Sequence, residues 1–226
     1  SYGEDDIKPI LDLLDSETEC YTVDCGLGVK EFLNAGCNVT TIDHHIGVKG
    51  EIEQLVQENK NYTFIFDNDK SGASLAWSYL FPNEPMPELI KYVEDSDLWK
   101  QKLGEDTKYV NNYLWMVVND PVAILGLMKG DLSEVKIRGE VITMYADKEV
   151  ANQVTRPPIN LKIGKWVVPA YNVSVYASAV GRSHSDRLGK AVAIFIILGD
   201  KVKFSFRSVD SHEPSALELA EVLGGS

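Results

Sequence analysis

Three short apolar runs in the first third of the chain each end in aspartate: Cys20-Tyr-Thr-Val-Asp24, Val39-Thr-Thr-Ile-Asp43 and Tyr62-Thr-Phe-Ile-Phe-Asp67. Each run has the length and the β-branched or aromatic content of a buried strand. Helical patterns at residues 29–35 and 51–58 separate them. Strands that alternate with helices form βαβ units, so this stretch predicts a parallel sheet. Ligands bind at the carboxyl ends of parallel strands, and we expect the three aspartates at that edge.

Helical patterns, one of them at residues 85–94, continue through the middle of the chain until Arg156-Pro157-Pro158, which ends them. The chain is then rich in strand patterns, the first at residues 159–163, with a hairpin turn at Gly199-Asp200. The predicted fold class is α/β, with a parallel-sheet domain joined by a helical linker to a smaller mixed-sheet α/β domain. We place these parts at residues 1–115, 116–156 and 157–226.

The composition indicates a globular protein with an acidic surface. Of 226 residues, 44% are hydrophobic and 25% are charged, which suits a folded soluble chain. Lys and Arg total 22 against 34 Asp and Glu, so the formal net charge is −12. This charge argues against binding of long duplex nucleic acid. It still permits a small phosphorylated substrate, because bound divalent cations reverse the sign of an acidic site.

Targeting and redox signals point to the cytoplasm. The longest apolar run, residues 191–198, is too short to cross a membrane, and no signal peptide pattern opens the chain. The three cysteines show no C-x-x-C spacing, which favours reduced thiols. We therefore expect a cytoplasmic protein without a membrane partner.

The two adjacent histidines, His44 and His45, directly follow Asp43. Neighbouring strand residues point to opposite faces, so the two cannot both be core residues. At a strand end both can face one cleft together with Asp24, Asp43 and Asp95. Imidazole and carboxylate ligands suit Mn²⁺, Fe²⁺ or Zn²⁺. A plain surface histidine pair is the alternative.

Several motifs follow one another in a fixed order along nearly the whole chain. They are Asp24 with Ile42-Asp-His-His45, Asp67-Asn-Asp-Lys-Ser-Gly-Ala, Tyr92-Val-Glu-Asp95-Ser-Asp97-Leu-Trp99, Lys203-Phe-Ser-Phe-Arg207-Ser208 and Gly224-Gly225. Together they resemble the DHH family of phosphoesterases with a C-terminal substrate-binding domain of the DHHA1 type, as in nanoRNase and oligoribonuclease-like proteins.

The resemblance implies a centre of two Mn²⁺ ions, with Mg²⁺ or Co²⁺ as substitutes. Asp24 corresponds to the bridging carboxylate, and His44 and Asp95 to further metal ligands. His45 corresponds to a catalytic residue that faces the substrate. Asp43 is expected to orient a neighbouring histidine rather than to bind metal itself.

The resemblance also implies substrate-binding residues at the other end of the chain: Arg207, Ser208, Gly224 and Gly225. Arg207 and Ser208 would hold a terminal phosphate, with Arg207 as a bidentate donor. A solvated strand residue is the alternative for Arg207.

Other polar and aromatic residues have a structural interpretation beside the functional one. An Asx turn and a helix N-cap explain Asp67 and Ser71. For His184, a solvated helix face is preferred to a phosphate contact. Tryptophans are more often core residues than surfaces for base stacking, and the sequence does not say which of them faces the site. The four are Trp77, Trp99, Trp115 and Trp166.

The implied activity is Mn²⁺-dependent hydrolysis of phosphodiester bonds in short oligonucleotides, by activation of water between two metals. Removal of phosphate from 3′-phosphoadenosine 5′-phosphate is a related activity. An inorganic pyrophosphatase or short-chain polyphosphatase is one alternative, and a non-catalytic nucleotide-binding module is another. A homodimer remains open.

Two departures from the family pattern lower the activity expected of the chain as given. Residues 1–19 contain no counterpart of the family's first metal-binding motif, and the histidine expected after Gly225 is absent. We therefore expect little or no hydrolysis by this chain, and an exposed edge on its first sheet.

Overall fold

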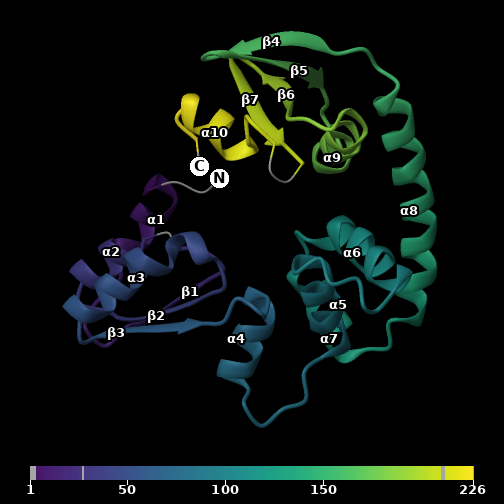
Figure 1. Ribbon diagram of the computed structural model, residues 1–226. Helices are drawn as coiled ribbons and strands as arrows, with labels where there is room; N and C mark the ends of the chain where they lie inside the picture. Colours follow the sequence, from purple (N-terminus) through teal and green to yellow (C-terminus); the bar gives the residue numbers. More distant parts are fainter. Residues whose placement is uncertain (1–3, 27, 210–211, 226) are drawn as a thin grey trace. The chain divides into compact units, whose positions relative to one another are not determined.

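The computed structural model describes residues 4–26, 28–209 and 212–225. The chain divides into two compact units, Ser1–Glu140 and Val141–Ser226. The division falls within helix α8 (Ser133–Val154), upstream of residue 157, where the second domain was predicted to begin (Figure 1). In the described part of the chain, no helix is both long enough and apolar enough to cross a membrane.

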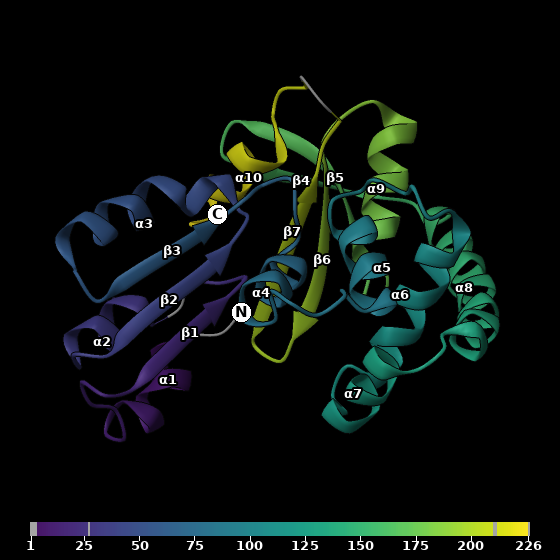
Figure 2. The same cartoon turned by 90° about the horizontal axis from the view of Figure 1, so that it is seen from below.

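Unit 1 begins with alternating strands and helices. In chain order its elements are α1 (Glu4–Leu11), β1 (Glu19–Val23), α2 (Val29–Asn34), β2 (Asn38–Asp43), α3 (Ile46–Glu58), β3 (Tyr62–Phe66), α4 (Gly72–Leu80), α5 (Glu88–Asp97), α6 (Glu105–Val117) and α7 (Pro121–Lys129). The strands form a parallel sheet in the order β1-β2-β3, as predicted (Figure 2). Since they are parallel, their carboxyl ends share one edge.

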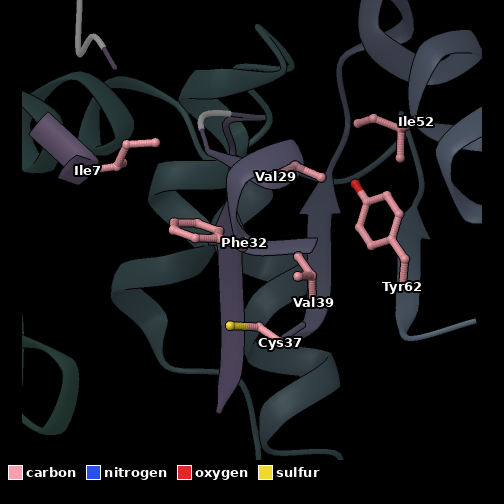
Figure 3. Close-up of a cluster of buried hydrophobic side chains, with 7 residues drawn as sticks. All are labelled: Ile7, Val29, Phe32, Cys37, Val39, Ile52 and Tyr62. Carbon is pink, nitrogen blue, oxygen red and sulfur yellow. The ribbon is translucent and has the colours of Figure 1, made fainter. Parts of the chain in front are cut away.

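The main core of unit 1 lies between the sheet and helices α1, α2 and α3. Its buried side chains are Ile7, Val29, Phe32, Cys37, Val39, Ile52 and Tyr62 (Figure 3). Thr41 lies on the same face of β2 as Val39, and its hydroxyl is 2.7 Å from both Thr22 Oγ1 and Tyr62 Oη. These hydroxyls hydrogen-bond to one another, so none of them is left without a partner inside the core.

Strand β1 is an edge strand of the described sheet. Its Tyr21 and Val23 are 47% and 39% exposed, so this strand carries solvent-exposed apolar side chains. Farther along the chain, α5, α6 and α7 pack around a second core that includes Tyr92, Val110 and Leu132.

Unit 2 is built on a mixed sheet, as the sequence predicts. Its elements after α8 are β4 (Ile159–Ile163), β5 (Trp166–Asn172), α9 (Ala177–Leu188), β6 (Val192–Leu198), β7 (Lys201–Arg207) and α10 (Ala216–Val222). The strand order is β4-β5-β6-β7, and only β5 and β6 pair in parallel. Successive residues of β6 pack on different helices, Ala193 in the core with α10 and Ile194 in the core with α9. The two helices therefore cover opposite faces of this sheet.

His184 corrects the expectation of a solvated helix face, since its side chain is fully buried. It lies on the face of α9 that carries Val180, which packs on the sheet. Its ring stacks on Tyr171 with the centroids 3.6 Å apart. Arg187 donates to Nδ1 at 3.0 Å, which leaves Nε2 buried and without a partner among the described residues.

The stability of unit 2 is expected to fall as the pH drops below about 6.5. Burial, and then the charge of Arg187, lowers the pKa of His184 from its ordinary value of 6.5. The unfolded chain therefore binds a proton at His184 near pH 6.5, whereas the folded chain binds it only at lower pH. Below about pH 6.5 this extra proton favours the unfolded state. Urea unfolding between about pH 5 and pH 8 measures this loss. In His184→Phe the free energy of unfolding should depend less on pH over this range. An unchanged pH profile would contradict the assignment of this dependence to His184.

Candidate metal centre

Asp24, His44 and His45 form a cluster at the carboxyl edge of the parallel sheet. Asp24 follows β1 and the two histidines follow β2, and one ligand atom from each lies within 4.8 Å of the others. All three residues are among those predicted from the sequence, and the parallel pairing of β1 and β2 brings them together.

His44 has the geometry of a metal ligand. Its side chain is 11% exposed, and Nε2 lies 3.1 Å from Asp24 Oδ1 and 3.4 Å from Asp97 Oδ2. Nevertheless Nε2 is buried and makes no hydrogen bond with acceptable geometry within the described chain. A buried ring nitrogen without a partner costs about 1–3 kcal/mol. A cation between the imidazole and the two carboxylates would satisfy all three groups.

Asp43 positions the second histidine, as the sequence predicts. Its carboxylate is buried, and Oδ1 accepts hydrogen bonds from the backbone N–H groups of His44 and His45 at 2.6 and 2.9 Å. The same oxygen lies 2.7 Å from His45 Nδ1. This hydrogen bond, with smaller contributions from the Asp43, Asp24 and Asp97 charges, raises the pKa of His45 against the opposing effect of burial. This hydrogen bond stabilises the protonated ring of His45 relative to a free histidine, and Asp43 does not occupy Nε2.

The first turn of α4 determines the space available to Asp24. A Cβ atom on Gly72 would lie 2.5 Å from Asp24 Oδ1 and 2.8 Å from its Cγ, so only glycine fits. Ser71 caps the helix by accepting from Ser74 N at 3.2 Å, and Asp67 Oδ1 accepts from Asp69 N at 3.0 Å. These two bonds confirm the N-cap and the Asx turn that the sequence suggests. The steric role of Gly72 was not predicted, although the Ser-Gly-Ala segment was noted.

Replacing Gly72 by alanine is expected to push the Asp24 carboxylate out of the cluster. Mn²⁺ affinity should fall about tenfold or more, with a stability loss of about 1–3 kcal/mol from overpacking. Gly126→Ala is the matched control, because that helical glycine has open space around its Cα. It should keep its Mn²⁺ affinity and gain up to about 1 kcal/mol. Equal Mn²⁺ affinity of the two variants in calorimetric titration would contradict the steric role.

Asp97, rather than Asp95, is the helix α5 residue that faces His44. The expectation for Asp95 is corrected here, because its buried carboxylate accepts hydrogen bonds from the N–H groups of Lys102 and Leu103, at 2.8 and 3.1 Å, and from the Thr107 hydroxyl. Burial opposes ionisation of this carboxyl, but the three hydrogen bonds outweigh it and lower the pKa of Asp95.

A signal for this arrangement exists in the sequence. Asp95 follows Tyr92 by three residues, on the buried stripe of α5, where an acid requires donors. Residues i and i+2 of a helix lie about 200° apart around its axis, so Asp97 faces elsewhere.

The residues predicted to bind substrate belong to unit 2. Arg207, Gly224 and Gly225 line one pocket of about 550 Å³, and Ser208 is not among its lining residues. Arg207 Nη2 donates to Ser178 Oγ at 2.6 Å. Ser208 Oγ accepts from the backbone N–H of Ala216 at 3.0 Å. The structure thus brings three of the four together, while a phosphate contact by Arg207 stays a prediction.

A large apolar cavity of about 1000 Å³ lies elsewhere in unit 1. Side chains of α4 to α7 line it, Trp77 and Trp115 among them, and none of the predicted metal ligands does. Imidazole and carboxylate groups gather at the sheet edge and not around this apolar cavity, so the sheet edge is the candidate functional site.

Comparisons with known proteins assign no family to the chain. No family model matches the sequence. An uncharacterized protein of Acanthamoeba polyphaga mimivirus is 25% identical over 118 residues, which covers 50% of this chain and 27% of the viral protein. The chain thus matches about a quarter of the length of that relative. The crystal structure of an uncharacterized protein from Helicobacter pylori G27 is 14% identical, with a TM-score of 0.33, over 93% of this chain and 77% of that one.

Proposed function

We propose that this protein is a metal-dependent phosphoesterase that hydrolyses phosphodiester bonds in short oligonucleotides. The observation that supports it best is the buried His44 Nε2, which has no hydrogen bond and faces the carboxylates of Asp24 and Asp97. The motif order described above supports the same activity. Residues 1–115 would carry the catalytic site, residues 157–226 the substrate-binding domain, and residues 116–156 the link between them.

The donor set fits one divalent cation. Asp24, His44 and His45 offer one carboxylate oxygen and two ring nitrogens within 4.8 Å of one another, and Asp97 Oδ2 lies 3.4 Å from His44 Nε2. These nitrogen and oxygen donors suit Mn²⁺, with Mg²⁺ or Co²⁺ as substitutes. A bound cation would supply a water of lowered pKa and would neutralise charge on the phosphoryl oxygens. The described residues contain no second cluster of this kind, so the second ion of the family pattern has no ligand set here beyond the shared Asp24.

His45 is the residue best placed to act on the substrate. Its side chain is 57% exposed, and Asp43 holds Nδ1 at 2.7 Å and favours the protonated ring. Nε2–H would then donate to a phosphoryl oxygen or to the leaving group. General acid catalysis by such a group contributes about 10²–10⁴-fold.

The substrate class follows from charge and from Arg207. A net charge of −12 gives no broad basic surface for a long strand, whereas two to five nucleotides need only a few cationic contacts. Arg207 lines a pocket with Gly224 and Gly225, where its guanidinium would bind a terminal phosphate.

Mn²⁺ titration and hydrolysis of diadenylate, with pyrophosphate in parallel, test the proposal. We expect one Mn²⁺ per chain and only slow metal-dependent release of AMP, since the described residues offer no ligand set for a second ion. In His44→Ala the affinity for Mn²⁺ should fall by at least about 100-fold, since even residues outside the ligand shell are worth 10–100-fold. His212→Ala is the control, because His212 does not belong to the cluster of Asp24, His44 and His45.

Each other result has a defined meaning. Release of phosphate from pyrophosphate alone would identify a pyrophosphatase. Binding of Mn²⁺ and AMP without turnover of either substrate would identify a nucleotide-binding module. Unchanged Mn²⁺ affinity in His44→Ala would overturn the metal centre itself.

A further inference from the structure

The loop after α5 lies at the same sheet edge as the metal cluster. Asp97, at the end of α5, reaches to 3.4 Å from His44. Lys100 Nζ donates at 2.8 Å to the carbonyl of Asp69, in the turn that follows β3. Trp99 stands between these two contacts, so its backbone is held at the edge where a substrate would meet the metal.

Asp95 makes this loop rigid. Its carboxylate holds the backbone of Lys102 and Leu103 and the side chain of Thr107, as described above. Its carbonyl also accepts from the N–H of Lys100 at 3.0 Å. A buried charged acceptor with this many donors fixes the course of the loop.

Trp99 is held in an unfavourable state in two respects. Its φ angle is +53°, a left-handed conformation that bulky residues rarely adopt. Its side chain is 80% exposed, more than that of Trp115 at 73%. No hydrogen bond, ring contact or cation contact involves its indole in the part of the chain that the structure describes. Strain of this kind gathers at functional sites.

We propose that the Trp99 indole stacks on the nucleobase of the substrate, next to the metal cluster. This inference rests on the proposed function and narrows its substrate class to phosphoesters that carry an aromatic base. Stacking tolerates any base, because every base has a π face. A rigid loop also lowers the entropy lost when the base binds.

Calorimetric titration in the presence of Mn²⁺ tests the proposal with AMP and ribose 5-phosphate, which share the phosphate and differ in the base. The wild-type chain should bind AMP about tenfold more tightly than ribose 5-phosphate. Trp99→Ala should abolish this preference and leave the ribose 5-phosphate affinity unchanged, whereas Trp99→Phe should retain most of it. Trp115→Ala is the matched control, an exposed tryptophan on α6, and should behave as wild type.

A preference for AMP that persists in Trp99→Ala would overturn the inference. Equal binding of AMP and ribose 5-phosphate by the wild-type chain would overturn it as well. In both cases the metal centre would be tested separately, by Mn²⁺ titration of His44→Ala without any nucleotide. Thermal unfolding of the Trp99 variants distinguishes an effect on binding from an effect on the fold.

Discussion

Asp24→Gly is expected to abolish Mn²⁺ binding and, at the same time, to stabilise the metal-free protein. Asp24 has a φ angle of +58°, which glycine adopts without strain. Its side chain is 47% exposed, and its carboxylate accepts no hydrogen bond from the described residues. Removing the side chain should raise the free energy of unfolding by about 1 kcal/mol, after the entropy of glycine in the unfolded chain is subtracted. Mn²⁺ affinity should fall by at least about 100-fold.

Urea unfolding in a chelating buffer and Mn²⁺ titration measure the two effects independently. Asp67→Gly is the control, since Asp67 directly follows β3 as Asp24 follows β1, and its carboxylate accepts a hydrogen bond from Asp69 N. That variant should lose stability and keep its Mn²⁺ affinity. A lower free energy of unfolding in Asp24→Gly, as is expected of Asp67→Gly, would show that the positive φ angle at Asp24 does not destabilise the metal-free protein.

Asp95→Ala is expected to destabilise unit 1 by about 3–5 kcal/mol, because it leaves the donors of Lys102, Leu103 and Thr107 without an acceptor. Asp97→Ala, two residues along the same helix, should change stability by less than about 1 kcal/mol, since its side chain is 39% exposed. The two variants should therefore affect different quantities. Asp95→Ala should lower the free energy of unfolding, and Asp97→Ala should lower the affinity for Mn²⁺. A larger stability loss in Asp97→Ala would reverse the roles assigned to the two aspartates.

Local sequence patterns predicted most secondary structure because each pattern depends on near neighbours. Strands β3 and β4 have the predicted bounds, Tyr62–Phe66 and Ile159–Ile163. Helix α5 is an exception, since it spans Glu88–Asp97 where residues 85–94 were expected. Pro85 and Pro87 favour extended backbone in the residues before them, and Pro87 is the N-cap. The shift brings Asp97 into the helix.

The sequence by itself determined the parallel α/β class of unit 1, the mixed sheet of unit 2 and the gathering of Asp24 and His44. Alternating strands and helices leave little choice of topology, and parallel strands bring their carboxyl ends to one edge. The family resemblance suggested that Asp43 orients a neighbouring histidine, and Asp43 Oδ1 lies 2.7 Å from His45 Nδ1.

Only the tertiary structure decided which helix residues face the cluster and which tryptophans are exposed. The choice between Asp95 and Asp97 depends on how α5 is rotated against its neighbours, and the burial of His184 depends on which face of α9 meets the sheet. The need for glycine at position 72 arises from a contact with Asp24, far away in the chain. Rotation and close approach are set by long-range packing, which local periodicity does not encode.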